Sequence, residues 1–502
     1  MNERRQIERR LADPRPLSVS ALADLSLDAL DHGLFEAITA RITQAIAAGA
    51  KDARLYQILG LARRGVLDGR GAVAAFEHAV RLAPKDALVA HGLARSTWEA
   101  GIPATAFYDR ALRLAPTDAS MLVGRAAALV AEQRGNDAIA AMTSILEENP
   151  GWHEGHAAYA RIHAASRMTG DGTATVRAAL ARYPGDPSLW RLLLSMLLDA
   201  RRYVEATEMA RAASSRLGEQ QEWRRVEAIG LSEAGEAEAA QRLFDRLTLT
   251  NSAAGLIRPL RNLIRMGRFD EATAMAERAF PMQEEVILWP YRSLLWRLVE
   301  DDRWHWLEGN PRLVGVYDLG LSAQEIAALA DMLRALHRRS GEFLDQSVRG
   351  GTQTDGNLLA RAEPEIRQLR DVLLEAVSAH IAQLPPAVVG HPTLIDPRAP
   401  VRIAGAWSVR LSGAGFHVDH VHPQGWLSSA FYVALPNGTN QASQEGWLAF
   451  GECRDILPTL DGFRQVEPAA GRLVLFPSTM WHGTRPFPAG ERMTVAFDIA
   501  RP

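Results

Sequence analysis

Hydrophobic and polar positions follow two different periods along the chain. From about residue 20 to about 300, apolar residues recur every three or four positions in text rich in Ala, Leu, Arg and Glu, which predicts amphipathic helices. Beyond about residue 395, the apolar stretches are short, rich in aromatic and β-branched residues, and separated by Gly, Pro or Asn, which predicts strands. The predicted strands are Trp407–Leu411, Leu427–Leu435, Trp447–Phe450, Leu473–Phe476 and Met493–Ile499. The pattern therefore predicts a helical part followed by a β-rich part.

Prolines recur at nearly constant spacing in the helical part. Pro84, Pro116, Pro150 and Pro184 are separated by 32, 34 and 34 residues. A small residue stands 24 positions before each proline, and a larger one stands 8 positions before it: Gly60, Gly92, Ala126 and Ala160, then Phe76, Tyr108, Met142 and Val176. Small residues let two helices approach closely, the larger residue fills the gap between them, and proline ends the second helix. The spacing therefore predicts repeated helix pairs.

This arrangement resembles the tetratricopeptide repeat. The resemblance implies an all-α solenoid over residues 51–299, preceded by a helical segment over 1–50, and less regular helix pairs at Gly230–Leu247 and Leu260–Phe280 continue the series. Stacked helix pairs form a curved surface that usually holds a peptide or protein. We therefore expect a protein or peptide partner on the repeats.

Charge and cysteine content exclude several classes of protein. The 502 residues carry 56 basic and 59 acidic side chains, a formal charge of −3, so we expect no nucleic-acid partner and no anionic membrane surface. The single cysteine, Cys453, permits neither an intramolecular disulfide nor a zinc site of several thiolates. No apolar run has the length of a membrane span or the pattern of a signal peptide. We expect a soluble, cytoplasmic protein.

Candidate metal ligands gather near the C-terminus. His417, Asp419, His420 and His422 fall within six positions, and His482 follows a later apolar strand. Residues two apart on a strand share a face, so a His-x-Asp or His-x-His pair offers two ligands to one metal, and a distant histidine completes a facial set. Such a set leaves positions open for substrate and molecular oxygen, which suits Fe(II).

A candidate carboxylate site follows these ligands. Arg492 can pair with a carboxylate through two parallel hydrogen bonds, and the hydroxyl of Thr494 can donate another, which together suit the dicarboxylate 2-oxoglutarate. The alternative is a surface ion pair between Arg492 and Glu491 or Asp498.

The C-terminal part resembles the Fe(II)- and 2-oxoglutarate-dependent oxygenases, in particular a bacterial and phage group often joined to tetratricopeptide repeats. The matching runs are Trp306–Gly309, Gly350–Thr354, His420–Pro423, Gly425–Val433, Phe476–Ser478 with His482, and Arg492–Thr494. The resemblance implies a double-stranded β-helix, a jelly-roll barrel with flanking helices, over residues 300–502. It also implies that His482 is the distal metal ligand and that Arg492 with Thr494, and Tyr432, bind 2-oxoglutarate.

The identity of the first two ligands stays open. His417 and Asp419 match the His-x-Asp motif of the wider superfamily and have the better metal chemistry, because a carboxylate lowers the charge of the Fe(II) complex. His420 and His422 match the narrower group, and we favour them. The two pairs face opposite sides of a regular strand unless a bulge intervenes.

Three functions are compatible with these features. We expect a dioxygenase that hydroxylates a substrate recruited by the repeats. The alternatives are a repeat scaffold or sensor with a degenerate oxygenase barrel, and a cupin-like metal enzyme that does not use 2-oxoglutarate. The run Gly350–Gly356 lacks the ending of a P-loop, and we interpret it as a turn or lid beside the active site.

Overall fold

The structure is a computed structural model that describes residues 2–166, 170–248, 251–337, 348–397, 400–436 and 444–502. The chain forms two compact units, Met1–Met142 with Asp355–Asp371, and Thr143–Thr354 with Val372–Pro502. The boundaries of these two units differ from those of the predicted modules 1–50, 51–299 and 300–502, and that division into modules stays a prediction. Among the described residues, no helix combines the length and the apolar character that crossing a membrane requires.

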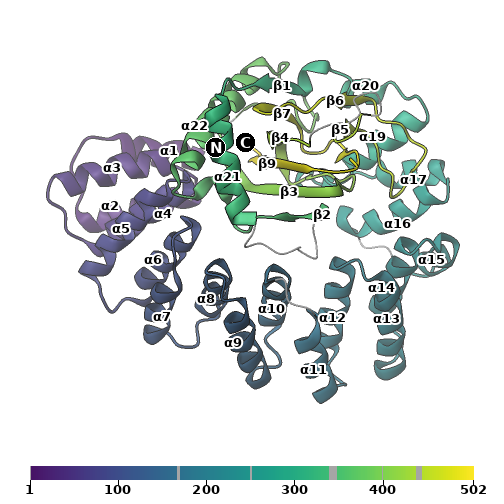
Figure 1. The fold of residues 1–502 in the computed structure, drawn as a ribbon, viewed down its shortest axis with the longest axis horizontal. Helices are drawn as coiled ribbons and strands as arrows, with labels where there is room; N and C mark the ends of the chain where they lie inside the picture. The colour runs from purple at the N-terminus through teal and green to yellow at the C-terminus, as the bar shows by residue number, and fades with distance from the viewer. Residues whose placement is uncertain (1, 167–169, 249–250, 338–347, 398–399, 437–443) are drawn as a thin grey trace. The chain divides into compact units, whose positions relative to one another are not determined.

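The chain begins with a series of helices that extends to Leu307, and within each unit Figure 1 shows successive helices lying side by side. Its first nine are α1 (Asn2–Ala12), α2 (Val19–Asp31), α3 (Phe35–Ala47), α4 (Ala53–Gly65), α5 (Gly69–Leu82), α6 (Ala87–Glu99), α7 (Thr105–Leu114), α8 (Ala119–Ala131) and α9 (Gly135–Glu148). The next are α10 (His153–Ala165), α11 (Ala174–Arg182), α12 (Pro187–Asp199), α13 (Tyr203–Leu217), α14 (Gln221–Glu233), α15 (Ala237–Phe244), α16 (Ala253–Arg265) and α17 (Phe269–Ala276). Three more precede the strands: α18 (Met282–Glu285), α19 (Trp289–Leu298) and α20 (Arg303–Leu307).

The recurring prolines stand where helices end, and aspartates cap the helices that follow. Helix α5 ends at Leu82, two residues before Pro84, and Asp86 then accepts hydrogen bonds from the backbone N–H groups of Leu88 (2.9 Å) and Val89 (3.1 Å). Asp118 and Asp186 begin α8 and α12 in the same way. The repeated pattern of stop and cap produces the predicted helix pairs.

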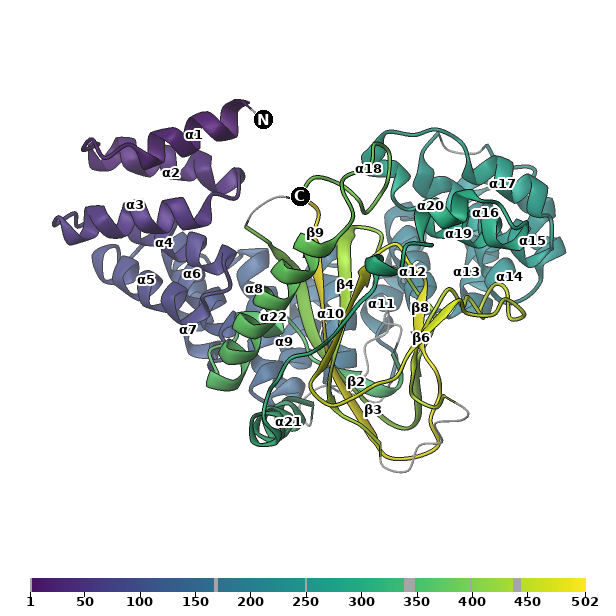
Figure 2. The ribbon, with the colours of Figure 1, turned by 90° about the horizontal axis from the view of Figure 1, so that it is seen from above.

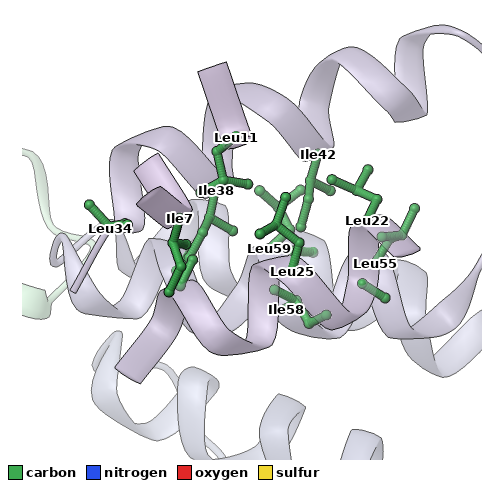
Figure 3. Close-up of a cluster of buried hydrophobic side chains, with 14 residues drawn as sticks. Ile7, Leu11, Leu22, Leu25, Leu34, Ile38, Ile42, Leu55, Ile58 and Leu59 are labelled. Atoms are coloured by element: carbon green, nitrogen blue, oxygen red, sulfur yellow. The ribbon is translucent and has the colours of Figure 1, made fainter. Parts of the chain in front are cut away.

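The small and large residues of the repeat also pack as predicted. A Cβ atom added at Gly60 or at Gly92 would lie 2.5 Å or 2.1 Å from the ring of Phe76, so the ring occupies the space between α4 and α6 that the two glycines leave. At the N-terminal end of the same unit, apolar side chains of α1 to α4 point toward one another and form a buried core (Figure 3).

The strands form two antiparallel sheets, which confirms a helical repeat region followed by an antiparallel β domain. The larger sheet has the order β1-β7-β4-β9-β3-β2, and the smaller has the order β6-β5-β8. The strands are β1 (Gly315–Asp318), β2 (Val348–Gln353), β3 (Ile403–His417), β4 (Gly425–Ala434), β5 (Leu448–Phe450), β6 (Arg464–Val466), β7 (Arg472–Pro477), β8 (His482–Thr484) and β9 (Glu491–Ala500). Two longer helices, α21 (Ala323–His337) and α22 (Pro364–Gln383), accompany them (Figure 2).

One expectation for this region is wrong. The run that begins at Gly350 is not a turn or lid: Gly351, Thr352 and Gln353 belong to β2, which pairs with β3 at the edge of the larger sheet. A bulge at Gly350, whose φ is 66°, accommodates the glycines within the strand.

The last repeat helices and the smaller sheet share a core within the second unit. Trp481, next to β8, donates its indole N–H to the carbonyl of Pro290 (3.0 Å) and packs edge-on against Tyr291 of α19. Arg297 at the end of α19 donates to the carbonyl of Gly451 (2.6 Å). Trp481, which immediately precedes His482, therefore lies in direct contact with the last repeat helices.

Candidate active site

The central strands β4 and β9 of the larger sheet carry the three predicted carboxylate-binding residues, Tyr432, Arg492 and Thr494. Strand β4 lies between β7 and β9, and its Tyr432 is paired with Thr494 while its Ser428 is paired with Asp498. The side chains of Arg492, Thr494 and Asp498 alternate with buried apolar residues along β9, so they share one face of the strand. That face lines a cavity of about 350 Å³.

Three histidines meet in this cavity. His420 and His482 form an isolated β-bridge with reciprocal backbone hydrogen bonds of 3.0 and 3.1 Å, and the backbone N–H of His422 donates to the carbonyl of Ser478 (2.8 Å). One nitrogen atom of each ring lies within 4.8 Å of those of the other two. The geometry brings together the favoured pair, His420 and His422, with the predicted distal residue His482.

Each of the three rings has its Nδ1 atom beside an oxygen. The partners are the carbonyl of Val418 for His420 (2.7 Å), the carbonyl of Met480 for His482 (2.9 Å) and Asp498 Oδ2 for His422 (2.8 Å). A carbonyl oxygen can only accept, so it fixes the tautomer with the proton on Nδ1 and the lone pair on Nε2. This is how metal-binding histidines are commonly oriented in proteins.

Burial and mutual proximity keep two of these imidazoles neutral. Burial, together with the electrostatic effect of the neighbouring imidazole of His422, lowers the pKa of His420 to about 3. Burial also holds the pKa of His482 well below its usual range. A neutral ring is the form that binds a metal.

The two members of the alternative pair have different surroundings, because Asp419 is bound by Arg454 whereas His417 lines the cavity. The side chain of Asp419 is 1 % exposed and accepts hydrogen bonds from the backbone N–H (2.9 Å), Nε (2.8 Å) and a terminal nitrogen (2.6 Å) of Arg454. His417, the last residue of β3, lines the cavity with its ring centroid 5.9 Å from that of His420, and its buried Nε2 atom has no hydrogen-bond partner among the described residues.

Arg492 is buried without a carboxylate partner among the described residues. Its side chain is 2 % exposed, its Nε atom donates to the carbonyl of Gly446 (3.2 Å), and its guanidinium carbon lies 5.1 Å from the centroid of the Tyr432 ring. Burial lowers the pKa of Arg492. The two candidate ion-pair partners are occupied, because Glu491 binds Arg334 and Arg410 while Asp498 binds His422.

The other two predicted carboxylate-binding residues lie close to Arg492. Thr494 is buried and lines the cavity, whereas Tyr432 lies against the guanidinium of Arg492, which its buried hydroxyl approaches. Burial raises the pKa of Tyr432.

Sequence reasoning missed the supporting role of Asp498 and Ser428. Asp498 Oδ1 accepts a hydrogen bond from the Ser428 hydroxyl (2.6 Å). This bond positions the carboxylate that is hydrogen-bonded to His422. The available signal was the period of two along β9, which places Asp498 on the same face as Arg492 and Thr494.

Comparison with known proteins identifies the strand-rich part of the chain. Residues 405–498 match the sequence model of a family described as "Putative 2OG-Fe(II) oxygenase", so this part is a domain of that family. No curated protein matches the chain.

Several solved structures each resemble less than half of the chain. A prolyl-4-hydroxylase from Pseudomonas putida is 18% identical, with a TM-score of 0.27, over 41% of this chain and 98% of that one. HygX from Streptomyces hygroscopicus, solved with nickel, 2-oxoglutarate and hygromycin B, is 15% identical, with a TM-score of 0.28, over 38% and 82%. A tetratricopeptide repeat protein from Parabacteroides merdae is 17% identical, with a TM-score of 0.30, over 45% and 91%.

Proposed function

We propose that the chain is an Fe(II)- and 2-oxoglutarate-dependent dioxygenase, in which His420, His422 and His482 hold the metal and Arg492 anchors 2-oxoglutarate. The family of the strand domain and the clustered histidines support the first part. The buried arginine that has no carboxylate partner supports the second, and it is the observation that carries the proposal.

The three histidines fit a divalent transition metal. Imidazole nitrogen suits iron among other metals, and three facial ligands leave positions for a co-substrate and oxygen. The hydrogen bonds of Nδ1 to Val418, Met480 and Asp498 hold the three rings in fixed orientations. The rings therefore need little reorientation to bind a metal.

The surroundings of Arg492 fit a carboxylate. A buried cation without a counter-ion is unfavourable, and a bound carboxylate would supply two charge-assisted hydrogen bonds that relieve this cost. Thr494 lines the cavity and Tyr432 lies against the guanidinium, so we expect their hydroxyls to donate to the same group, and the unpartnered Nε2 of His417 is a further polar atom in this cavity.

When bound, the metal and 2-oxoglutarate supply the oxidising chemistry, in which molecular oxygen hydroxylates a C–H bond as 2-oxoglutarate becomes succinate and carbon dioxide. The chain itself orients these groups. Asp498 and Ser428 hold His422 in place, Arg492 fixes the far end of the co-substrate, and the apolar residues Leu448 and Phe476 that line the cavity exclude water.

The proposal extends to the substrate and to the surroundings of the enzyme. We propose that the substrate is a protein or peptide recruited by the helical repeats, whose stacked helices offer an extended surface. The near-neutral charge supports the absence of nucleic-acid partners, and the single cysteine, which fits a reducing compartment, supports a cytoplasmic location.

Anaerobic titration of the full chain with Fe(II) and 2-oxoglutarate tests the proposal. We expect one equivalent of 2-oxoglutarate to bind only when Fe(II) is present, with a weak visible charge-transfer band, and succinate to form once oxygen and a substrate are supplied. Arg492→Gln should weaken 2-oxoglutarate binding by about a hundredfold and leave the iron content unchanged, because it removes the bidentate charged contact. Arg410→Gln, in which the removed arginine pairs with Glu491 on the neighbouring strand, is the matched control.

Three outcomes would contradict the proposal. Metal binding without 2-oxoglutarate binding would favour a cupin-like enzyme, because the ligand set contains only histidine. Binding of neither would favour a non-catalytic scaffold. Unchanged 2-oxoglutarate affinity in Arg492→Gln would remove the role assigned to this arginine.

A further inference from the structure

An arginine from the helical repeats lines the cavity that holds the three histidines. Arg201 stands in the turn between α12 and α13, and every other residue lining the cavity lies between positions 353 and 498. The repeats therefore contribute a charged side chain directly to the candidate active site, and both elements belong to the second compact unit.

The backbone of Arg201 makes this choice of residue notable. Its φ of 55° lies in the left-handed region, which costs an L-residue with a side chain more than it costs glycine. Several other turns of the repeat series place glycine in this region, as at Gly101, Gly235 and Gly267, although Leu67 and Gln133 are also exceptions. The backbone alone would favour glycine at position 201, so the side chain needs another explanation.

The charges around Arg201 favour the binding of an anionic group. A neighbouring cavity of about 550 Å³ is lined by Arg201 and by three further arginines, Arg258, Arg261 and Arg265. These three share the carboxylate of Glu233, which is only 5 % exposed. The charge of Glu233 is thus covered, whereas Arg258, whose side chain is 40 % exposed, presents positive charge to the cavity.

The present partner of Arg201 is weakly held. A terminal nitrogen of Arg201 lies 3.7 Å from Asp455 Oδ2, with side chains that are 38 % and 45 % exposed. A long, solvated ion pair contributes little to stability, so an incoming carboxylate can replace Asp455 at small cost.

We infer that Arg201 recognises an acidic side chain of a peptide substrate, and that the cluster of Arg258, Arg261 and Arg265 receives a further acidic group of the same segment. The inference rests on the proposed function and names its substrate class. The carboxylates of Asp199, Glu233 and Asp455 line the same cavity, so the site has only a modest excess of positive charge. That excess fits single carboxylates better than the dense charge of a phosphate backbone.

Fluorescence anisotropy of labelled peptides with the full chain tests the inference. The probes are a decapeptide of alternating Glu and Gly and its counterpart of alternating Gln and Gly, measured with Ni(II) and 2-oxoglutarate present and again without them. We expect the acidic peptide to bind about tenfold more tightly than the amide peptide, and added salt to reduce the difference.

Two substitutions remove the guanidinium without straining the turn. Arg201→Gly and Arg201→Asn both suit a positive φ, so the fold should be retained, and each should reduce the preference for the acidic peptide about fivefold or more. Arg211→Gln, on the same helix pair but paired with Glu227, should retain the full preference.

The results separate this inference from the proposed function. Equal binding of the two peptides, or an unchanged preference in both Arg201 variants, would overturn the inference even if 2-oxoglutarate binds with metal. A preference that depends on Arg201 would uphold it even if metal-dependent 2-oxoglutarate binding fails, in which case the oxygenase assignment alone is lost.

Discussion

At the scale of single residues, Asp419 is separated from the histidine cluster by its pairing with Arg454. Three hydrogen bonds from Arg454 surround the carboxylate, and Gly483 of β8 lies so close that an added Cβ would be 2.1 Å from Asp419 Oδ1. The carboxylate is therefore a structural tie between the segment after β3 and the segment after β5. It is one position from His420 in sequence, but it is engaged elsewhere.

This arrangement predicts different effects for two substitutions in the cluster. His422→Ala should reduce the iron content of purified protein to about a tenth or less, because a first ligand is removed. Asp419→Asn should retain the iron but lower the free energy of unfolding by about 2 kcal/mol, since it removes the charge from a buried pair whose arginine remains partly solvated. Iron analysis and urea denaturation measure the two effects. Iron loss in Asp419→Asn with retention in His422→Ala would instead make His417 and Asp419 the ligands.

The types of residue in the site were predictable from sequence, but the choice among them was not. Four candidate ligands fall within six positions of the sequence. His482 was identified because it follows an apolar strand, and Arg492 because it lies at the start of the next one. The engagement of Asp419, which supports the choice of His420 and His422, depends on Arg454, and Arg454 is 35 positions away and carries no local signal. The alternation rule could not help either, because β3 ends at His417 and the following residues leave the strand.

At the scale of elements, the length of a strand determined whether the alternation of apolar and polar residues could predict it. The five predicted strands correspond to β3, β4, β5, β7 and β9. Strands β6 and β8 have three residues each, which is too short for a period of two to be recognised. Strand β2 was missed because glycine disfavours strands, whereas pairing with β3 stabilises it in the fold.

The end of α20 contains a buried carboxyl group. Glu308 Oε2 accepts hydrogen bonds from the Ser293 hydroxyl (2.5 Å) and from the indole N–H of Trp304 (3.3 Å), which join α19 to α20. Burial outweighs these bonds and the nearby charge of Arg297, and raises the pKa of Glu308 to about 7. The folded protein therefore binds this proton more tightly than the unfolded chain does.

Stability should consequently fall as pH rises through the range between the unfolded and folded pKa values of Glu308. The free energy of unfolding should decrease by roughly 3 kcal/mol between pH 5 and pH 8 from this group alone, because the folded state must lose a proton that burial favours. Glu308→Gln keeps both hydrogen-bond acceptor contacts and removes the titration. Urea denaturation of both proteins at the two pH values measures the difference. A variant that is no more stabilised relative to the parent at pH 8 than at pH 5 would contradict this account.

At the scale of the whole molecule, each compact unit has its own buried core. Apolar residues of α1 to α5 form one cluster in the first unit, and residues of α16 and α19 with Trp481 form another in the second. Segment Asp355–Asp371 belongs to the first unit, where the backbone N–H of Ala362 donates to the carbonyl of Ala100 (3.0 Å). A repeat array gains its stability from contacts between neighbouring helices, so damage within one unit should stay largely local.

Gly92→Ala tests whether damage stays within one unit, and the surroundings of Gly92 determine whether the substitution raises or lowers the free energy of unfolding. Alanine favours a helix over glycine by about 1 kcal/mol, but the new Cβ would lie 2.1 Å from the ring of Phe76, which Gly60 blocks from the other side. Because the ring cannot retreat, overpacking should prevail and lower the free energy of unfolding of the first unit by about 2 kcal/mol. Hydrogen–deuterium exchange should therefore become faster in α4 to α8 and stay unchanged in β3, β4 and β9.

A second glycine provides the control for that experiment. Gly151 has no atom within 4 Å of an added Cβ and follows Pro150, so Gly151→Ala should leave exchange unchanged throughout. If Gly92→Ala accelerates exchange in the central strands as much as in α4 to α8, the two units unfold as one. The proposed metal-binding histidines would then depend on the integrity of the first unit, and we expect that Gly92→Ala would reduce iron retention although it removes no proposed ligand.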